Sequence, residues 1–386
     1  MTIRLEPRTS VPRWLSPALT IGAVAVALTI SGAVIAAVGG DPVASYLHIL
    51  NASFGSVGVL SDTLVKATPL ILTGLACALA FRMRLWNIGA EGQFLLGAWG
   101  ASAVVLFPLV PDGTPAIILI PVMMLAGMLA GGLWGFIPGV LRARLGVNEI
   151  IATLMLNYVA LLWIQFWVFG AWSESGFQQT KAFPDAALLP RLADFADAVP
   201  AFAGLTVHLG LLFGLVTAGL LWLFLERSRW GYEIRLIGDS PRAARYAGID
   251  IGRRLIIVFA ISGAIAGLAG MSEVSGVVGR LQDRISPGYG FTAVIVAYLA
   301  KFRPGRVIVA AILFGALILA GREIQPSGVP AMIQGIILFT LIVADVLVRY
   351  RVRIERRVPV TAAAASPPAA SPPAASPPAP SPGAGG

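Results

Sequence analysis

The sequence predicts an all-α polytopic membrane protein with about ten transmembrane helices. Hydrophobic residues make up 57% of the 386 residues, and charged residues make up only 12%. A soluble domain carries roughly a quarter charged residues, so this chain lacks the side chains to cover a water-facing surface. Long uncharged segments also alternate with short basic ones, which is typical of helices that cross a lipid bilayer and of the loops that join them.

Ten apolar segments are candidates for membrane spans. A span needs about 20 apolar residues, or fewer where a helix is broken inside protein. The first segment follows Arg4, Arg8 and Arg13 and is longer than the core of a signal peptide, so we expect it to be retained. The predicted transmembrane domain covers 17–348, with spans at residues 17–38, 63–81, 89–107, 116–137, 149–169, 206–225, 255–272, 289–300, 306–320 and 330–348.

The basic residues predict the orientation of these spans. If the N-terminus is cytoplasmic, the cytoplasmic segments hold 22 of the 28 lysines and arginines. Cytoplasmic loops carry such an excess, and one missed span would invert every later loop. We therefore predict that both termini are cytoplasmic. The cytoplasmic segments are residues 1–16, 82–88, 138–148, 226–254, 301–306 and 349–386.

Two regions depart from a simple alternation of spans and loops. The spans 289–300 and 306–320 are short, and we expect half-helices or a re-entrant pair beside a translocation path. A thin, tilted hairpin at the periphery is the alternative. The long connection 170–205 is either a set of interfacial helices that meet an extracytoplasmic partner or a solvated loop.

The tail 349–386 is basic at first and then changes composition. From Val358 onward it carries neither charge nor a large apolar side chain beyond the first residues, and the unit AASPP recurs three times. Such a segment has nothing to bury in a core, so we expect it to be disordered with polyproline character.

The loop 226–254 contains seven arginines and a short segment with start and stop signals for a helix. Ser240 is a favourable N-cap, Pro241 suits the first helical turn, and Gly248 can take the left-handed conformation that ends a helix. The sequence therefore predicts a helix at 241–247. A capped helix on the polar loop of a membrane protein indicates a docking site for a partner.

Polar side chains inside apolar spans are candidates for a solute path. Such residues are costly in a bilayer and usually face a bundle interior or a cavity. Asn87, Glu91 and Gln93 open the third span, although Glu91 could instead pair with Arg82 or Arg84. Asn157 lies two turns inside the fifth span, and hydrogen bonding between helices is its favoured alternative.

Small residues indicate close helix packing and a weak internal repeat. The segment 261–270 places glycine, alanine and serine at four-residue spacing, which lets two backbones approach closely. Small-residue spans precede both GAEGQF at 89–94 and GYGFT at 288–292, and the second unit runs in the opposite direction. Inverted repeats that enclose a solute at their interface are a recurring transporter design.

Five ordered motifs resemble the permease subunits of ABC importers of the ribose/simple-sugar and branched-chain amino-acid superfamily. The resemblance spans roughly residues 60–345 and is closest to the nucleoside-type branch. Trp86 stands where the family has phenylalanine, and 298–301 replaces a small-residue stretch. The motifs are LWNIGAEGQFLLGA (85–98), GVNEIIATLMLNYVA (146–160), GDSPRAARYAGI (238–249), ISGAIAGLAG (261–270) and GYGFTAVIVAYL (288–299).

This resemblance implies a multi-pass protein of a bacterial inner (plasma) membrane and a set of partners. These are cytoplasmic ABC ATPase subunits, a second permease (the same or a homologous one) and an extracytoplasmic solute-binding protein. ATP and magnesium belong to the ATPase, and this chain is expected to bind no cofactor or metal itself. The residues that resemble the family's coupling helix are Asp239, Pro241, Arg242, Ala243, Ala244, Arg245 and Tyr246.

The leading interpretation is a permease that takes up a nucleoside or a related small polar solute. Asn87, Gln93, Asn157 and Thr292 would hydrogen-bond the solute, and Phe291 would stack on it. A simple-sugar permease is the alternative.

Other classes of function explain less of the sequence. In an ion-coupled secondary transporter Glu91 would be the ion site, but the capped basic loop would have no role. None of the chain's lysines is preceded by glycine, so no P-loop exists and ATP hydrolysis falls to a separate subunit. Only His48 and His208 are histidines, so a membrane enzyme has little support. Because the basic residues lie in short loops, nucleic acid is not an expected partner.

Overall fold

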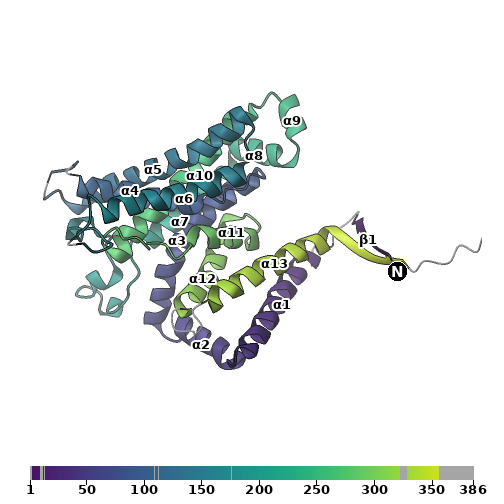
Figure 1. Ribbon diagram of the computed structural model, residues 1–386, viewed down its shortest axis with the longest axis horizontal. Coiled ribbons are helices and arrows are strands. Elements are labelled where there is room, and N and C mark those ends of the chain that lie inside the picture. Colours follow the sequence, from purple (N-terminus) through teal and green to yellow (C-terminus); the bar gives the residue numbers. More distant parts are fainter. Residues whose placement is uncertain are drawn as a thin grey trace, which may run out of the picture.

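The computed structural model describes residues 2–8, 12, 14–107, 109–111, 113–174, 176–321 and 328–355. It is a helical bundle with one small pair of strands (Figure 1). The helices are α1 Leu15–Ala37, α2 Pro42–Phe54, α3 Val57–Arg82, α4 Ala90–Leu106, α5 Ala116–Leu145, α6 Glu149–Phe169, α7 Gly210–Arg227, α8 Arg229–Asp239, α9 Pro241–Tyr246, α10 Ile251–Glu273, α11 Tyr289–Leu299, α12 Pro304–Ala320 and α13 Val329–Arg349.

All ten predicted spans fall on helices. Among the described residues, seven helices are long and apolar enough to cross a membrane: α1, α3, α5, α6, α7, α10 with its π-helical extension Val274–Val278, and α13. Helices α4, α11 and α12 are shorter. The prediction of an all-α polytopic membrane protein is therefore confirmed.

Helices α3 and α10 form the centre of the bundle. Most of each helix is buried, whereas the other long apolar helices are largely exposed. Helix α10 packs against α4 and α5 from the first half of the chain, and α3 packs against α11 and α12 from the second half. If α3 corresponds to α10, α4 to α11 and α5 to α12, each central helix packs against two helices of the other repeat. This arrangement agrees with the predicted internal repeat.

Glycines set the distance between α10 and its neighbours. A Cβ atom added to Gly267 would lie 2.2 Å from the Gly127 carbonyl oxygen, and one added to Gly263 would lie 2.3 Å from that of Gly131. No side chain larger than hydrogen fits at these positions without moving a backbone. The close-packing face predicted at 261–270 is confirmed.

The two short helices α11 and α12 are part of the core. Both pack on α3, so the alternative of a peripheral hairpin is wrong. The turn between them takes Lys301 and Phe302 through the left-handed region, with φ of 51° and 58°. Pro304 then begins α12, where its missing N–H costs no helical hydrogen bond.

The connection 170–205 contains no α-helix among its described residues, so the alternative of interfacial helices is wrong, and much of the segment is exposed. It contains three single 3₁₀ turns, at Asp185–Ala187, Leu192–Phe195 and Pro200–Phe202. Its backbone is hydrogen-bonded to the segment that follows α10: Thr180 N donates to Leu281 O and Phe183 N to Gly279 O. These backbone hydrogen bonds hold the segment against one end of the bundle.

Described residues near the two ends of the chain form a small sheet. Strand β2 (Tyr350–Glu355) follows α13 directly and pairs antiparallel with β1 (Thr2–Pro7), so the basic first part of the predicted tail forms a strand. Helices α1 and α13 lie side by side and bring these strands together (Figure 1). The proline-rich remainder at 356–386 lies outside the described residues.

Candidate functional site

The N-termini of α4 and α11 meet inside the bundle. The first N–H groups of a helix have no partner within it and carry partial positive charge. Gly290 N of α11 donates to the Glu91 carboxylate over 2.6 Å, and Gly92 N of α4 donates to Asn157 Oδ1 over 2.8 Å. Glu91 and Asn157 thus each accept a hydrogen bond from an N–H group at the start of a neighbouring helix. Glu91 pairs with neither Arg82 nor Arg84, so that interpretation is wrong.

A network of amides holds the start of α4 against the two central helices. Asn87 Nδ2 donates to Gln93 Oε1 and to Ser262 Oγ of α10, each over 2.9 Å. Ser262 in turn donates to Ala76 O of α3 over 2.7 Å. Asn87 and Gln93 are both buried, so in this conformation their hydrogen bonds go to protein rather than to a solute.

Asn157 also lies at this helix start, whereas Thr292 and Phe291 lie on α11 outside the network. Asn157 Nδ2 donates to Ile88 O over 2.9 Å, which is the interhelical bonding expected as the alternative. Thr292 Oγ1 donates to Gln334 of α13 over 2.9 Å. Phe291 is half-exposed. The structure therefore brings Asn87, Glu91, Gln93 and Asn157 together around one helix start, and it places Phe291 and Thr292 on α11 beyond it.

A cavity of about 660 Å³ opens at the end of the bundle opposite the loop 226–254. It lies between the first half of α3, the end of α10 and the segment leading into α11. Its walls carry both charge signs and several hydroxyl groups. The polar lining residues are Asp62, Lys66, Arg191, Thr206, Glu273, Gln282, Arg284, Ser286 and Tyr289.

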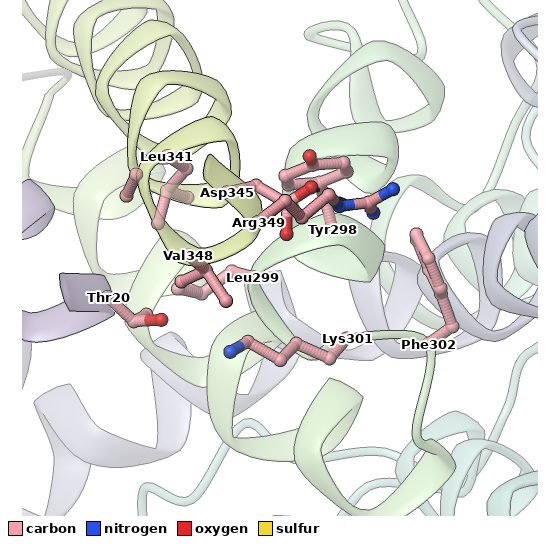
Figure 2. A pocket seen from close by; sticks show the side chains of 10 residues that line it. Thr20, Tyr298, Leu299, Lys301, Phe302, Leu341, Asp345, Val348 and Arg349 are labelled. Carbon is pink, nitrogen blue, oxygen red and sulfur yellow. Dashed lines mark ion pairs between the residues drawn. The ribbon is translucent and has the colours of Figure 1, made fainter. Parts of the chain in front are cut away.

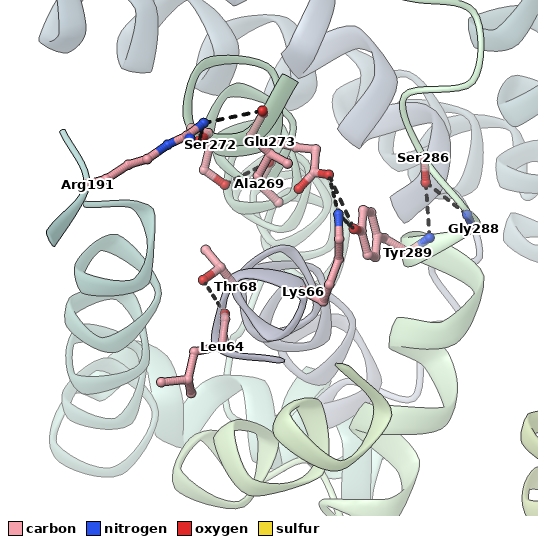
Figure 3. Close-up of polar contacts among 12 residues, drawn as sticks. Leu64, Lys66, Thr68, Arg191, Ala269, Ser272, Glu273, Ser286, Gly288 and Tyr289 are labelled. Atoms are coloured by element: carbon pink, nitrogen blue, oxygen red, sulfur yellow. Dashed lines mark hydrogen bonds and ion pairs between the residues drawn. The ribbon is translucent and has the colours of Figure 1, made fainter. Parts of the chain in front are cut away.

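The inner wall of this cavity holds a buried ion pair. Lys66 Nζ of α3 lies 3.4 Å from Glu273 Oε1 of α10 and 3.4 Å from the Tyr289 hydroxyl, which donates to the same carboxylate over 3.3 Å (Figure 3). The three side chains come from α3, α10 and α11 and are all buried. Ionisable groups at this depth are costly, and they usually mark a solute or ion pathway.

The predicted docking helix forms at the opposite end of the bundle. Ser240 Oγ accepts a hydrogen bond from Ala243 N over 3.3 Å, Pro241 occupies the first turn, and Gly248 has a φ of +73°. Helix α9 projects from the bundle beside α8 (Figure 1). Its side chains are exposed, 95% in the case of Tyr246, except for Ala244, which is buried. Asp239 is the last residue of α8.

Helix α8 precedes α9 in the chain and contacts both central helices, α3 and α10. Glu233 of α8 lies 2.5 Å from Arg254 at the start of α10, and the Arg254 guanidinium stacks 3.6 Å from the Trp230 ring centroid. At the end of α3, Arg82 pairs over 3.3 Å with Glu226 of α7, which also lies 3.5 Å from Arg235 of α8. A Cβ atom added to Gly238 would lie 2.2 Å from Arg82 O, so α8 and α3 are in direct backbone contact.

In the part of the chain that the structure describes, no group of three or more histidine, cysteine, aspartate or glutamate side chains is placed to hold a metal ion. Residues 59–345 match the protein family described as the permease component of the branched-chain amino acid transport system. The chain belongs to this family. Because such proteins are permease subunits, the chain is not an enzyme.

Three ABC transporter permeases are similar to this one over most of its length. A glucose ABC transporter permease of Haloferax volcanii is 37% identical, over 91% of this chain and 94% of its own. A guanosine ABC transporter permease of Bacillus subtilis is 36% identical, over 84% and 91% of the two chains. A nucleoside ABC transporter permease of Lactococcus lactis is 32% identical, over 79% and 84%. These relatives agree on the transporter type and differ in the solute.

Sequence reasoning missed the ion pair at the heart of the permease. Lys66 is one of the six lysines and arginines outside the predicted cytoplasmic segments, and Glu273 follows the predicted end of its span by one residue. The available signal was a lysine within an apolar span, since an ionisable residue in a membrane marks a functional site by default. Its partner becomes evident only once α3 and α10 are side by side.

Proposed function

We propose that this permease is the transmembrane subunit of an ABC importer that takes up a nucleoside or a related small polar solute. The observation that carries the proposal is the placement of α3 and α10. One end of each helix contacts α8, beside the exposed helix α9: α3 through the backbone at Gly238, and α10 through the Glu233–Arg254 pair. The other end supplies Lys66 or Glu273 to the cavity. A force applied at α9 is thereby transmitted to the cavity through two rigid helices.

In this proposal the loop 226–254 and both termini are cytoplasmic, and the cavity faces the outside of a bacterial plasma membrane. Cytoplasmic ATPase subunits dock on α9, bind ATP with magnesium and supply the energy. A solute-binding protein delivers the solute to the cavity end, and a second permease, identical or homologous, completes the path. Rigid-body rocking of the helices then alternates access to the two sides.

The cavity chemistry suits a neutral, hydrogen-bonding solute. Hydroxyl groups of Thr206, Ser286 and Tyr289 accompany cations and carboxylates in its lining, so a hydroxylated ring could find both donors and acceptors. The guanosine and nucleoside permeases among the relatives favour a nucleoside. Asn87, Glu91, Gln93, Asn157, Phe291 and Thr292 remain proposed path residues for a conformation in which the helix starts separate.

A simple sugar is the second candidate solute. The glucose permease of Haloferax volcanii is similar over nearly the whole chain, and Phe291, the proposed stacking residue, is not among the residues that line the cavity. Uptake of labelled guanosine and labelled glucose by cells that express the permease with its ATPase and binding protein separates the two. Guanosine uptake without glucose uptake is expected, and the reverse result would establish the sugar.

The energy source tests the transporter class. Uptake should stop when ATP is depleted and survive collapse of the proton gradient. Uptake that follows the gradient instead would identify an ion-coupled carrier and refute the ABC proposal. The docking role is tested by co-purification: removal of 239–248 should abolish capture of the ATPase, and unchanged capture would show that the ATPase docks elsewhere.

A further inference from the structure

Three adjoining cavities form one groove along α1. The first, of about 210 Å³, lies where α1, α11 and α13 meet at the end that carries the basic loops, and Thr20 and Leu299 belong to its lining. The second, of about 520 Å³, shares both of these residues. The third, of about 310 Å³, shares Val24 and Leu28 with the second and reaches α2. The transport path proposed above uses none of this groove.

One end of the groove is cationic. The turn after α11 holds Lys301 in a left-handed conformation, and its side chain extends across the cavity toward Thr20 and contacts Ser16 Oγ (Figure 2). Arg349 lines the same cavity, where it pairs with Asp345 over 2.9 Å, and Arg306 lines the second cavity. These two adjoining cavities therefore carry three cations and one carboxylate.

The local environment of Lys301 favours an additional anion. Burial is the main cause that lowers the pKa of its ammonium group, and Asp345 opposes this shift only in part. An anion beside the ammonium would stabilise its charged form. Arg306 is exposed and has no ion-pair partner among the described residues, so it can contribute to binding the same anion.

The remainder of the groove is apolar and runs into the membrane-spanning part of the bundle. Its walls are aliphatic and aromatic. The one tyrosine hydroxyl in this part of the lining, that of Tyr46, donates a hydrogen bond to Leu28 O over 2.6 Å. The apolar lining residues include Val24, Leu28, Ile49, Phe54, Leu313 and Ile337. A cationic pocket at a membrane boundary, continued by an apolar groove, matches a phosphate group joined to acyl chains.

We propose that this groove binds an anionic phospholipid from the bilayer. The phosphate group lies between Lys301, Arg306 and Arg349, and the acyl chains lie along α1 toward α2. A bound lipid of this kind would fasten the α1–α13 pair to α11 and α12. A second copy of the chain would need to bring an acidic group to this pocket, whereas the bilayer supplies phosphate at the required depth.

The test compares two lipids with the same acyl chains, phosphatidylglycerol and phosphatidylcholine. The full-length permease is purified in detergent, mixed with each lipid, and the retained lipid is counted by native mass spectrometry. We expect severalfold more retained phosphatidylglycerol. The double variant Lys301→Ala with Arg306→Ala should lower it to the level of phosphatidylcholine, while Arg144→Ala, which removes an exposed cation at the same end on α5, should not.

A second variant tests the apolar part of the groove. Ala25 is exposed and lines the second cavity, so Ala25→Trp fills the groove without disturbing the core. It should lower retention of both lipids, which a site for free phosphate alone would not show. Equal retention of the two lipids by the wild type, or a double variant that behaves like Arg144→Ala, overturns the proposal. So does an Ala25→Trp variant that changes the oligomeric state but not lipid retention.

Discussion

At the residue scale, the Lys66–Glu273 pair should contribute to stability as a unit. The Glu273→Leu substitution leaves the Lys66 ammonium buried without its carboxylate partner, and breaking a buried pair in this way costs about 3–5 kcal/mol. The double variant Lys66→Met with Glu273→Leu removes both charges and should recover most of that loss. Thermal unfolding of the purified permease in detergent measures both effects, and solute uptake should be lost in both variants.

An exposed ion pair provides the matched control. Arg280 and Glu174 lie 3.4 Å apart at the same end of the bundle, and each is about one-third exposed. Exposed pairs contribute about 0–1 kcal/mol, so Glu174→Gln should change the unfolding temperature little. A Glu273→Leu variant that is as stable as Glu174→Gln would show that the buried pair does not hold α3 to α10.

Gly267 tests the close contact between α10 and α5. The Gly267→Ala substitution places a Cβ atom 2.2 Å from Gly127 O, so the two backbones must separate. Overpacking of this kind costs about 1–3 kcal/mol, and the unfolding temperature should fall. Gly219→Ala on α7 is the control because a Cβ atom there meets nothing within 4 Å, and it should be neutral or slightly stabilising. Equal effects of the two variants would contradict the close packing.

At the element scale, α8 and α9 should have separable roles. Tyr246→Ala removes an exposed side chain of the docking helix and should weaken capture of the ATPase. Glu233→Gln breaks the 2.5 Å pair with Arg254 but leaves the surface of α9 intact. It should therefore keep ATPase capture and lower uptake, so that ATP is hydrolysed with less transport. Pull-down and paired measurements of hydrolysis and uptake check this, and a Glu233→Gln variant that loses ATPase capture would contradict the separation.

The sequence predicted the elements whose signals are local. Ten apolar segments became helices, and the cap residues Ser240 and Gly248 located α9 to within one residue of its end. Helix α8 was not predicted from the sequence. Charged residues separate its apolar side chains at helical spacing, Trp230, Ile234 and Ile237, so the segment has no continuous apolar run. Strands β1 and β2 were not predictable, since they pair across the whole length of the chain.

In the candidate site, too, the sequence predicted local features but not contacts between distant segments. Polarity within apolar segments identified Asn87, Glu91, Gln93 and Asn157, which the structure brings together. Their partners could not be predicted, because the break before α4 and the start of α11 meet only in the folded bundle. Glu91 illustrates this: its neighbours in sequence are arginines, but its hydrogen-bond partner is Gly290, 199 positions away.

At the scale of the whole molecule, the proposed orientation assigns each end of the bundle to one side of the membrane. The chain offers a direct test because its one cysteine, Cys77, is fully buried and should not react with thiol reagents. Arg284 is exposed at the cavity and Tyr246 is exposed on α9, at the opposite end. In intact cells a membrane-impermeant maleimide should label Arg284→Cys, and it should label Tyr246→Cys only after the membrane is permeabilised. Addition of the transported solute with its binding protein should slow labelling of Arg284→Cys, because the solute would occupy the same cavity. Labelling of Tyr246→Cys in intact cells would place the docking helix outside, where no ATP-driven partner could reach it.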